Sequence, residues 1–61
     1  MFYEDFKRAI EAFLTKHQMS ATAFGTEALG DPGFVFDLRR GRSCGLKIVD
    51  KVYAFMEKDH G

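Results

Sequence analysis

The side chains that could do chemistry in this 61-residue sequence are few and far apart. The two histidines, His17 and His60, are separated by most of the chain, and the single cysteine, Cys44, has no partner at metal-ligand spacing. A nucleophilic cysteine needs a nearby base and a shaped pocket, which a unit this small rarely encloses. No glycine-rich stretch carries the Lys-Ser/Thr ending of a phosphate-binding loop. We therefore expect no catalytic residue, metal, cofactor or small-molecule substrate.

The remaining side chains with functional potential are the positively charged Lys and Arg residues. Nine Lys and Arg balance nine Asp and Glu, so the formal net charge is zero, but the charges are unevenly placed. The segment 39–51 holds five basic residues and one acid, so it carries a net charge of +4 and the remainder −4. Such a patch can face phosphate on an otherwise neutral protein. The alternative is an ordinary solvated charged face.

Length and composition predict one small domain spanning residues 1–61. The 46% apolar fraction and seven Phe suffice for a single core, and 30% charged residues exclude the disordered and membrane classes. A chain this short buries only about 60% of its unfolded surface, so association should matter to its stability. A single cysteine excludes an internal disulfide, no apolar run could span a membrane, and the N-terminus is acidic. We expect a cytoplasmic protein.

Local patterns predict the first two helices. Segment 3–17 repeats apolar residues at helical spacing, with acidic residues in its first turn and basic residues in its last. Ser20 is the expected N-cap of a second helix, 20–29, which Gly30 ends. Gly25 inside that helix costs about 1 kcal/mol relative to alanine. This cost makes sense if another backbone packs closely against that point.

Asp31 and Pro32 predict the start of a third helix, 32–40, because they favour the N-cap and first helical positions. Val35 and Leu38 should face the core from it. The opposite face should hold Gly33, Phe34, Asp37 and Arg40. A strand at 34–36 is the weaker alternative, since no second clear strand exists to pair with it.

Apolar spacing predicts a fourth helix, 46–58, with an apolar face wider than one core needs.

Four short helices with a tight link between the second and third have the layout of a helix-turn-helix domain. The sequence resembles the lambda-repressor/Cro-like helix-turn-helix family between Leu14 and Met56. That pattern has a capping Ser, an apolar residue four later with a small residue beside it, apolar residues fifteen and eighteen later, and Gly at twenty-one. Here these positions hold Ser20, Phe24, Gly25, Val35, Leu38 and Gly41. The turn glycine expected nine residues after the serine is replaced by Leu29, with Gly30 following.

The resemblance implies an all-α domain of four or five helices that acts as a sequence-specific transcriptional regulator, like small phage and prophage repressors. It implies that helix 32–40 reads the major groove of double-stranded DNA, as a dimer on two half-sites. The protein would then sit on the nucleoid when bound. The base contacts we expect are Gly33, Phe34, Asp37 and Arg40. This helix lacks the Gln, Ser and Asn residues common in the family.

Chemistry separates these candidates. Arg40 is the best of them, because its guanidinium can donate two hydrogen bonds to guanine. Asp37 is better suited to pairing with Arg40 or Arg39 than to reading a base. We expect Phe36 to pack in the core, although an exposed Phe could touch thymine methyl groups.

Phosphate contacts are expected at the start of the second helix and beyond the end of the third, because helix N-termini and basic side chains both bind phosphate. The expected residues are Ser20, Ala21, Thr22, Thr26, Arg39, Arg42, Ser43 and Lys47. For Lys47 a solvated surface role is an equal alternative.

Dimer contacts should come from spare apolar residues on the terminal helices. The candidates are Phe2, Tyr3, Tyr53, Phe55 and Met56, of which Phe55 is the best; the ordinary core is the alternative, above all for Tyr53 and Met56.

A protein-interaction module on the same fold, such as an adaptor or an antitoxin-like partner, is the main alternative function. It would be favoured if Phe34 and Phe36 were exposed together, since aromatic residues anchor protein interfaces. A helical catalytic domain has almost no support.

Overall fold

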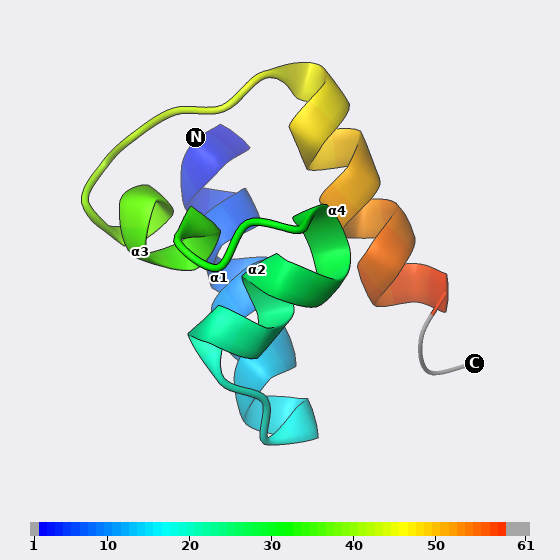
Figure 1. The fold of residues 1–61 in the computed structure, drawn as a ribbon. Coiled ribbons are helices and arrows are strands. Elements are labelled where there is room, and N and C mark those ends of the chain that lie inside the picture. Colours follow the sequence, from blue (N-terminus) through cyan, green and yellow to red (C-terminus); the bar gives the residue numbers. More distant parts are fainter. Residues whose placement is uncertain (1, 59–61) are drawn as a thin grey trace.

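The structure is a computed structural model in which residues 2–58 are described, with side-chain burial for residues 4–58. All regular structure in this range is helical, which confirms the expected all-α fold and makes the alternative strand at 34–36 wrong. The helices are α1 (Phe2–His17), α2 (Ala21–Leu29), α3 (Phe34–Arg39) and α4 (Leu46–Lys58). Helix α2 lies in front of α1, and the segment between α3 and α4 crosses the molecule in a wide arc (Figure 1). None of these helices is both long and apolar enough to cross a membrane.

Local hydrogen bonds end α1 and begin α2. The N–H of Met19 donates to the carbonyl of Leu14 at 2.9 Å, and the N–H of Gln18 donates to the carbonyl of Thr15 at 3.3 Å. This is the pattern of a Schellman motif, with Gln18 in the left-handed region at φ 52°. The hydroxyl of Ser20 accepts from the N–H of Ala23 at 3.0 Å, so its expected capping role is confirmed.

Helix α3 is shorter than the predicted span of 32–40. The carboxylate of Asp31 accepts from the N–H of Gly33 at 3.0 Å, and the N–H of Phe34 donates to the Asp31 carbonyl at 3.2 Å. Residues 31–33 therefore form a turn, and the helix begins at Phe34. Asp31 acts within the turn and not as an N-cap, which is why the predicted start was two residues too early. At the other end, Gly41 at φ 96° closes the helix one residue earlier than predicted.

The core draws side chains from all four helices. Phe6, Ile10, Phe24, Val35 and Val52 are essentially fully buried. Phe24 lies at its centre and packs edge-on against Phe13, at a ring separation of 5.6 Å. The core thus fixes α2 and α4 on α1 and holds α3 through Val35.

The close approach expected at Gly25 is confirmed. A Cβ placed on Gly25 would overlap the carbonyl oxygen of Asp31 and would lie 3.4 Å from the Cβ of Phe34. The carbonyl of Gly25 also accepts from the N–H of Asp31 at 3.0 Å. Only a residue without a side chain lets the turn before α3 lie this close to α2.

Candidate nucleic-acid interface

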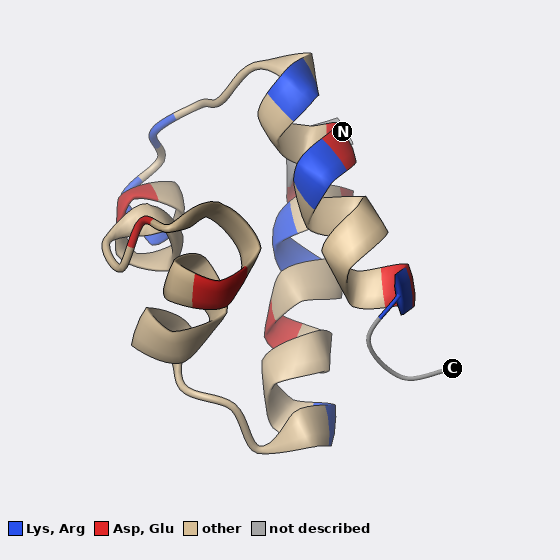
Figure 2. Cartoon of the chain, turned by 45° about the vertical axis from the view of Figure 1, so that its right-hand side comes forward, with Lys and Arg blue, Asp and Glu red and all other residues tan. Residues whose placement is uncertain are grey.

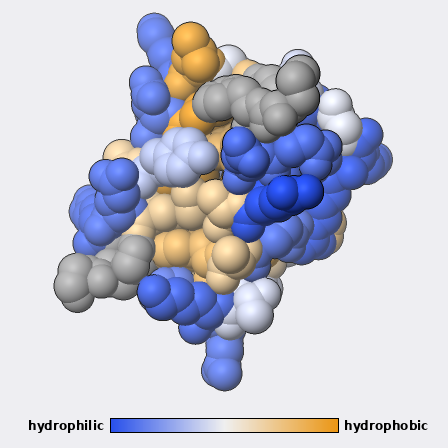
Figure 3. Space-filling model, turned by 180° about the vertical axis from the view of Figure 1, so that it is seen from behind, coloured by the Kyte–Doolittle hydropathy of each residue, from blue (hydrophilic) through white to orange (hydrophobic). Residues whose placement is uncertain are grey.

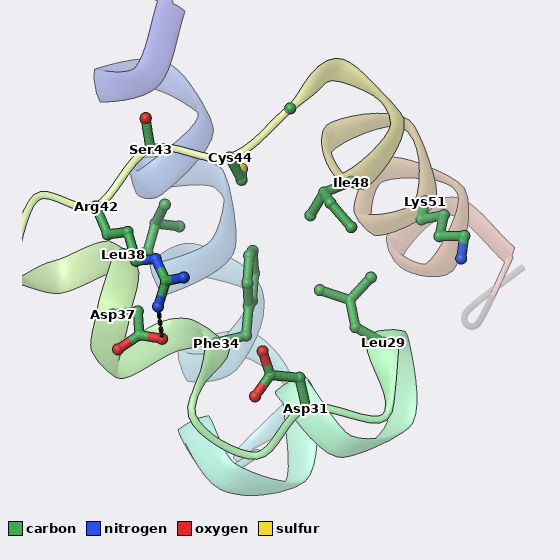
Figure 4. Close-up of a pocket in the computed structure, with 11 residues that line it drawn as sticks. Leu29, Asp31, Phe34, Asp37, Leu38, Arg42, Ser43, Cys44, Ile48 and Lys51 are labelled. Carbon is green, nitrogen blue, oxygen red and sulfur yellow. Dashed lines mark hydrogen bonds and ion pairs between the residues drawn. The ribbon is translucent and has the colours of Figure 1, made fainter.

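The inner face of α3 is formed by Phe34, Val35 and Leu38. Val35 and Leu38 are buried, as expected, but Phe34 is also buried, with only 6% of its surface exposed. The prediction that Phe34 contacts bases is therefore wrong. In Figure 4 the ring of Phe34 points from the start of α3 toward Cys44, with Leu38 on one side and Leu29 and Ile48 on the other.

The outer face of α3 carries Phe36, a residue that the sequence predicts in the core. Phe36 is 43% exposed, so the expectation that it packs inside is wrong. Arg40 lies four residues later, which places the two side chains on the same face of the chain, one turn apart. The spacing of Val35 and Leu38 marks the buried side of the helix but does not by itself separate Phe34 from Phe36.

Asp37 is shared by two arginines. Its carboxylate accepts from the guanidinium of Arg40 at 3.4 Å and from that of Arg42 at 3.1 Å. The pair with Arg40 was expected, whereas the stronger contact with Arg42 was not. Both arginines remain largely exposed, at 78% and 75% of their side-chain surface. The three groups together leave one net positive charge at the end of α3.

Arg39 is anchored to α1. Its guanidinium donates two hydrogen bonds to the carboxylate of Glu11, at 2.7 and 2.9 Å. The hydrogen bond to Arg39 holds the pKa of Glu11 below its ordinary value and raises that of Arg39, so both groups stay charged. The same guanidinium lies 5.7 Å from the ring centre of Phe36. A phosphate at Arg39 would have to compete with Glu11.

The other predicted phosphate contacts lie on two sides of α3. Ser20, Thr22 and Thr26 are exposed on α2, whereas Ala21 is half-buried against the core. Arg42, Ser43 and Lys47 are exposed on the segment after α3 and at the start of α4. In both ribbon views α3 lies between the start of α2 and this second group, whose Lys and Arg are blue in Figure 2. Gly33, half-buried, is in the turn before α3.

A groove of about 350 Å³ runs beside α3. Its apolar walls come from Leu29, Phe34, Leu38 and Ile48, and its rim carries Asp31, Asp37, Arg42 and Lys51 (Figure 4). Cys44 lines the same groove and is half-buried. Two acids and two bases face the groove, so its charges do not select an anion or a cation.

The predicted dimer residues are used mainly within the chain. Met56 is buried, with 7% exposed, so its assignment to an interface is wrong. Phe55 is half-buried and packs against the ring of Phe24 at 5.4 Å, and Tyr53 is half-buried against Phe6 at 5.5 Å. The side chains of Phe2 and Tyr3 lie outside the described residues.

Other apolar surface is exposed instead. Leu46, the first residue of α4, is 72% exposed. A small apolar area on the rear of the molecule is framed by hydrophilic side chains (Figure 3). The choice of Phe55 as the principal dimer contact stays a prediction.

Residues 2–58 form a small all-α domain with four helices. Comparison with protein-family models, curated proteins and solved structures found no match. The likeness to the lambda-repressor/Cro-like family therefore remains a resemblance in residue pattern.

Proposed function

We propose that the chain is a cytoplasmic, sequence-specific DNA-binding transcriptional regulator. Helix α3 enters the major groove of double-stranded DNA, and two copies of the chain bind two half-sites. The observation that carries this proposal is the exposure of Phe36 on the outer face of α3 and of Arg40 directly after that helix, which Val35 and Leu38 anchor in the core. A helix anchored on one face and free on the other suits insertion into a groove.

The surroundings of α3 support the same function. The start of α2, with the exposed residues Ser20 and Thr22, lies on one side of it, and the segment that holds Arg42, Ser43 and Lys47 lies on the other. These are the groups that bind phosphate oxygens and fix the position of a protein on a duplex. Base contacts from Arg40 would then supply sequence preference.

The alternative of an interaction module without DNA binding is less well supported. Exposure of Phe34 and Phe36 together would have favoured it, but Phe34 is buried. One exposed aromatic side chain on a six-residue helix is a small anchor for a protein interface.

A mobility-shift assay against a pool of random duplexes, followed by sequencing of the retained DNA, tests the proposal. If each subunit neutralises about four phosphates, the logarithm of the affinity should fall with the logarithm of salt concentration with a slope near −7 for the dimer. Affinity that does not depend on salt, or retained DNA without any shared sequence, would contradict the proposal.

Variants separate base contacts from phosphate contacts. Arg40→Ala should weaken binding to the selected sequence by about 1–3 kcal/mol while changing random DNA much less. Arg42→Ala should weaken both to the same degree. Lys58→Ala is the matched control, because it removes one exposed charge at the far end of α4. Equal losses on both kinds of DNA for Arg40→Ala would exclude Arg40 from base reading.

A further inference from the structure

The outer face of α3 combines one aromatic and one cationic side chain. Phe36 is one of two exposed large hydrophobic residues among those described, and Arg40 follows one helical turn later. An apolar group that covered this ring in a complex would contribute free energy to binding, because it would remove apolar surface of Phe36 from water. Such a group must lie where a helix in the major groove can reach it.

In the major groove one apolar group stands out on the base edges, the methyl group at C5 of thymine; 5-methylcytosine carries the same group. Guanine presents two acceptors, O6 and N7, which a guanidinium can bind together. We propose that α3 reads a 5-methylpyrimidine close to a guanine, with Phe36 against the methyl group and Arg40 on the guanine. This inference rests on the proposed function and names the DNA feature that it recognises.

The spacing on the helix agrees with this assignment. Residues four apart lie about 6 Å apart along the helix axis, which is between one and two base-pair rises of about 3.4 Å. The two bases should therefore be neighbours or be separated by one base pair. If the two bases are neighbours, the recognised feature is one dinucleotide step, for example TpG or methylated CpG.

Two further side chains position the ring. The Arg39 guanidinium lies 5.7 Å from the ring centre of Phe36, and two hydrogen bonds to Glu11 hold that guanidinium on α1. A cation on one face of the ring restrains it. Glu11 and Arg39 are in this sense positioning residues, whereas Phe36 and Arg40 touch the DNA.

Base analogues in a selected duplex test the inference with the wild-type protein alone. Selection from a random duplex pool should yield sites in which T lies within two base pairs of G. Replacing that T by deoxyuridine removes only the methyl group and should weaken binding about fourfold for each half-site. Replacing the guanine by 7-deazaguanine removes one acceptor and should also weaken binding. If the selected site holds CG instead, methylation of that cytosine should strengthen binding by about the same factor.

Variants then assign each effect to its side chain. Phe36→Ala should bind the thymine and deoxyuridine duplexes equally while remaining sensitive to 7-deazaguanine. Arg40→Ala should show the opposite pattern. Leu46→Ala is the matched control, because it removes the other exposed large hydrophobic side chain and should keep both sensitivities. Circular dichroism of each variant verifies that the helices are retained.

The outcomes distinguish the two proposals. If no duplex is selected, the proposed function fails, and this inference fails with it. If a sequence is selected but wild-type affinity does not change with the methyl group, this inference is overturned while DNA binding stands. Retained methyl sensitivity in Phe36→Ala would likewise overturn the role of Phe36.

Discussion

Replacing Gly25 by alanine has two opposite effects on stability: alanine favours the helix, but its side chain disturbs the packing of α2 against its neighbours. In an exposed helix this substitution stabilises by about 1 kcal/mol. In this chain the new Cβ would overlap the carbonyl oxygen of Asp31. That oxygen belongs to the backbone of the turn before α3, which is also tied to Gly25 by the hydrogen bond from the Asp31 N–H at 3.0 Å. The turn therefore has to move, because no flexible side chain can yield in its place.

The balance of these effects predicts destabilisation. Displacing packed elements costs about 1–3 kcal/mol, and weakening the hydrogen bond adds about 1 kcal/mol. After the gain in propensity, Gly25→Ala should lower the free energy of unfolding by about 1–3 kcal/mol. A chain of this length has only about 3–9 kcal/mol in total. Each kcal/mol lowers Tm by about 4–8 °C in a domain of this size, so thermal and urea unfolding followed by circular dichroism will resolve the change.

Thr26→Ala is the matched control for this experiment. Thr26 is the next residue of α2 and is exposed, so alanine there should stabilise by about 0.5 kcal/mol through propensity alone. A Gly25→Ala chain that is as stable as the wild type, or gains stability as Thr26→Ala does, would refute the close packing of α2 on the turn. The placement of α3 would then be wrong as well.

Three other substitutions test separate parts of the fold and the interface. Gln18→Gly should stabilise by about 1 kcal/mol, measured by urea unfolding, because Gln18 has a left-handed conformation at φ 52° that glycine adopts without cost. Glu11→Gln should cost less than about 1 kcal/mol at pH 7, since the Glu11–Arg39 pair is half-exposed. The pKa of Glu11 is lowered from 4.5 in the folded state, so the ion pair contributes fully to the free energy of unfolding above pH 4.5. This contribution is lost as the pH falls through the lowered pKa. The free energies of unfolding of the wild type and Glu11→Gln should therefore converge in acid. Asp37→Asn should raise affinity for random DNA and steepen the salt dependence by about 0.9 for each subunit, because it frees one positive charge; an unchanged slope would show that Asp37 does not offset the arginines.

Much of the helical structure could be predicted because its signals are local. Ser20 and Gly30 act at the ends of α2 as their residue types indicate. The start of α3 could not be predicted in the same way, since an Asp before a Pro suits both an N-cap and a turn. The difference depends on which N–H the carboxylate accepts from, and here it is that of Gly33, two residues later.

The faces of α3 were only partly predictable for a related reason. Val35 and Leu38 are three apart and define the buried side, but a helix of six residues is too short for periodicity to say which flanking Phe joins them. The tertiary contact decides, because the absence of a side chain at Gly25 makes room for Phe34. Phe36 is left on the outer face.

The charge pattern of the sequence overstates the positive electrostatic field at α3, the helix that we propose reads DNA. Arg39 is paired with Glu11, which lies 28 residues away, and Asp37 offsets one of its two arginines. A weaker local field means weaker attraction to any duplex, whatever its sequence. In the proposed function, discrimination between duplexes would then come from direct contacts at base edges, which we assign to Phe36 and Arg40. The acids beside the arginines would limit non-specific binding and leave these proposed contacts intact.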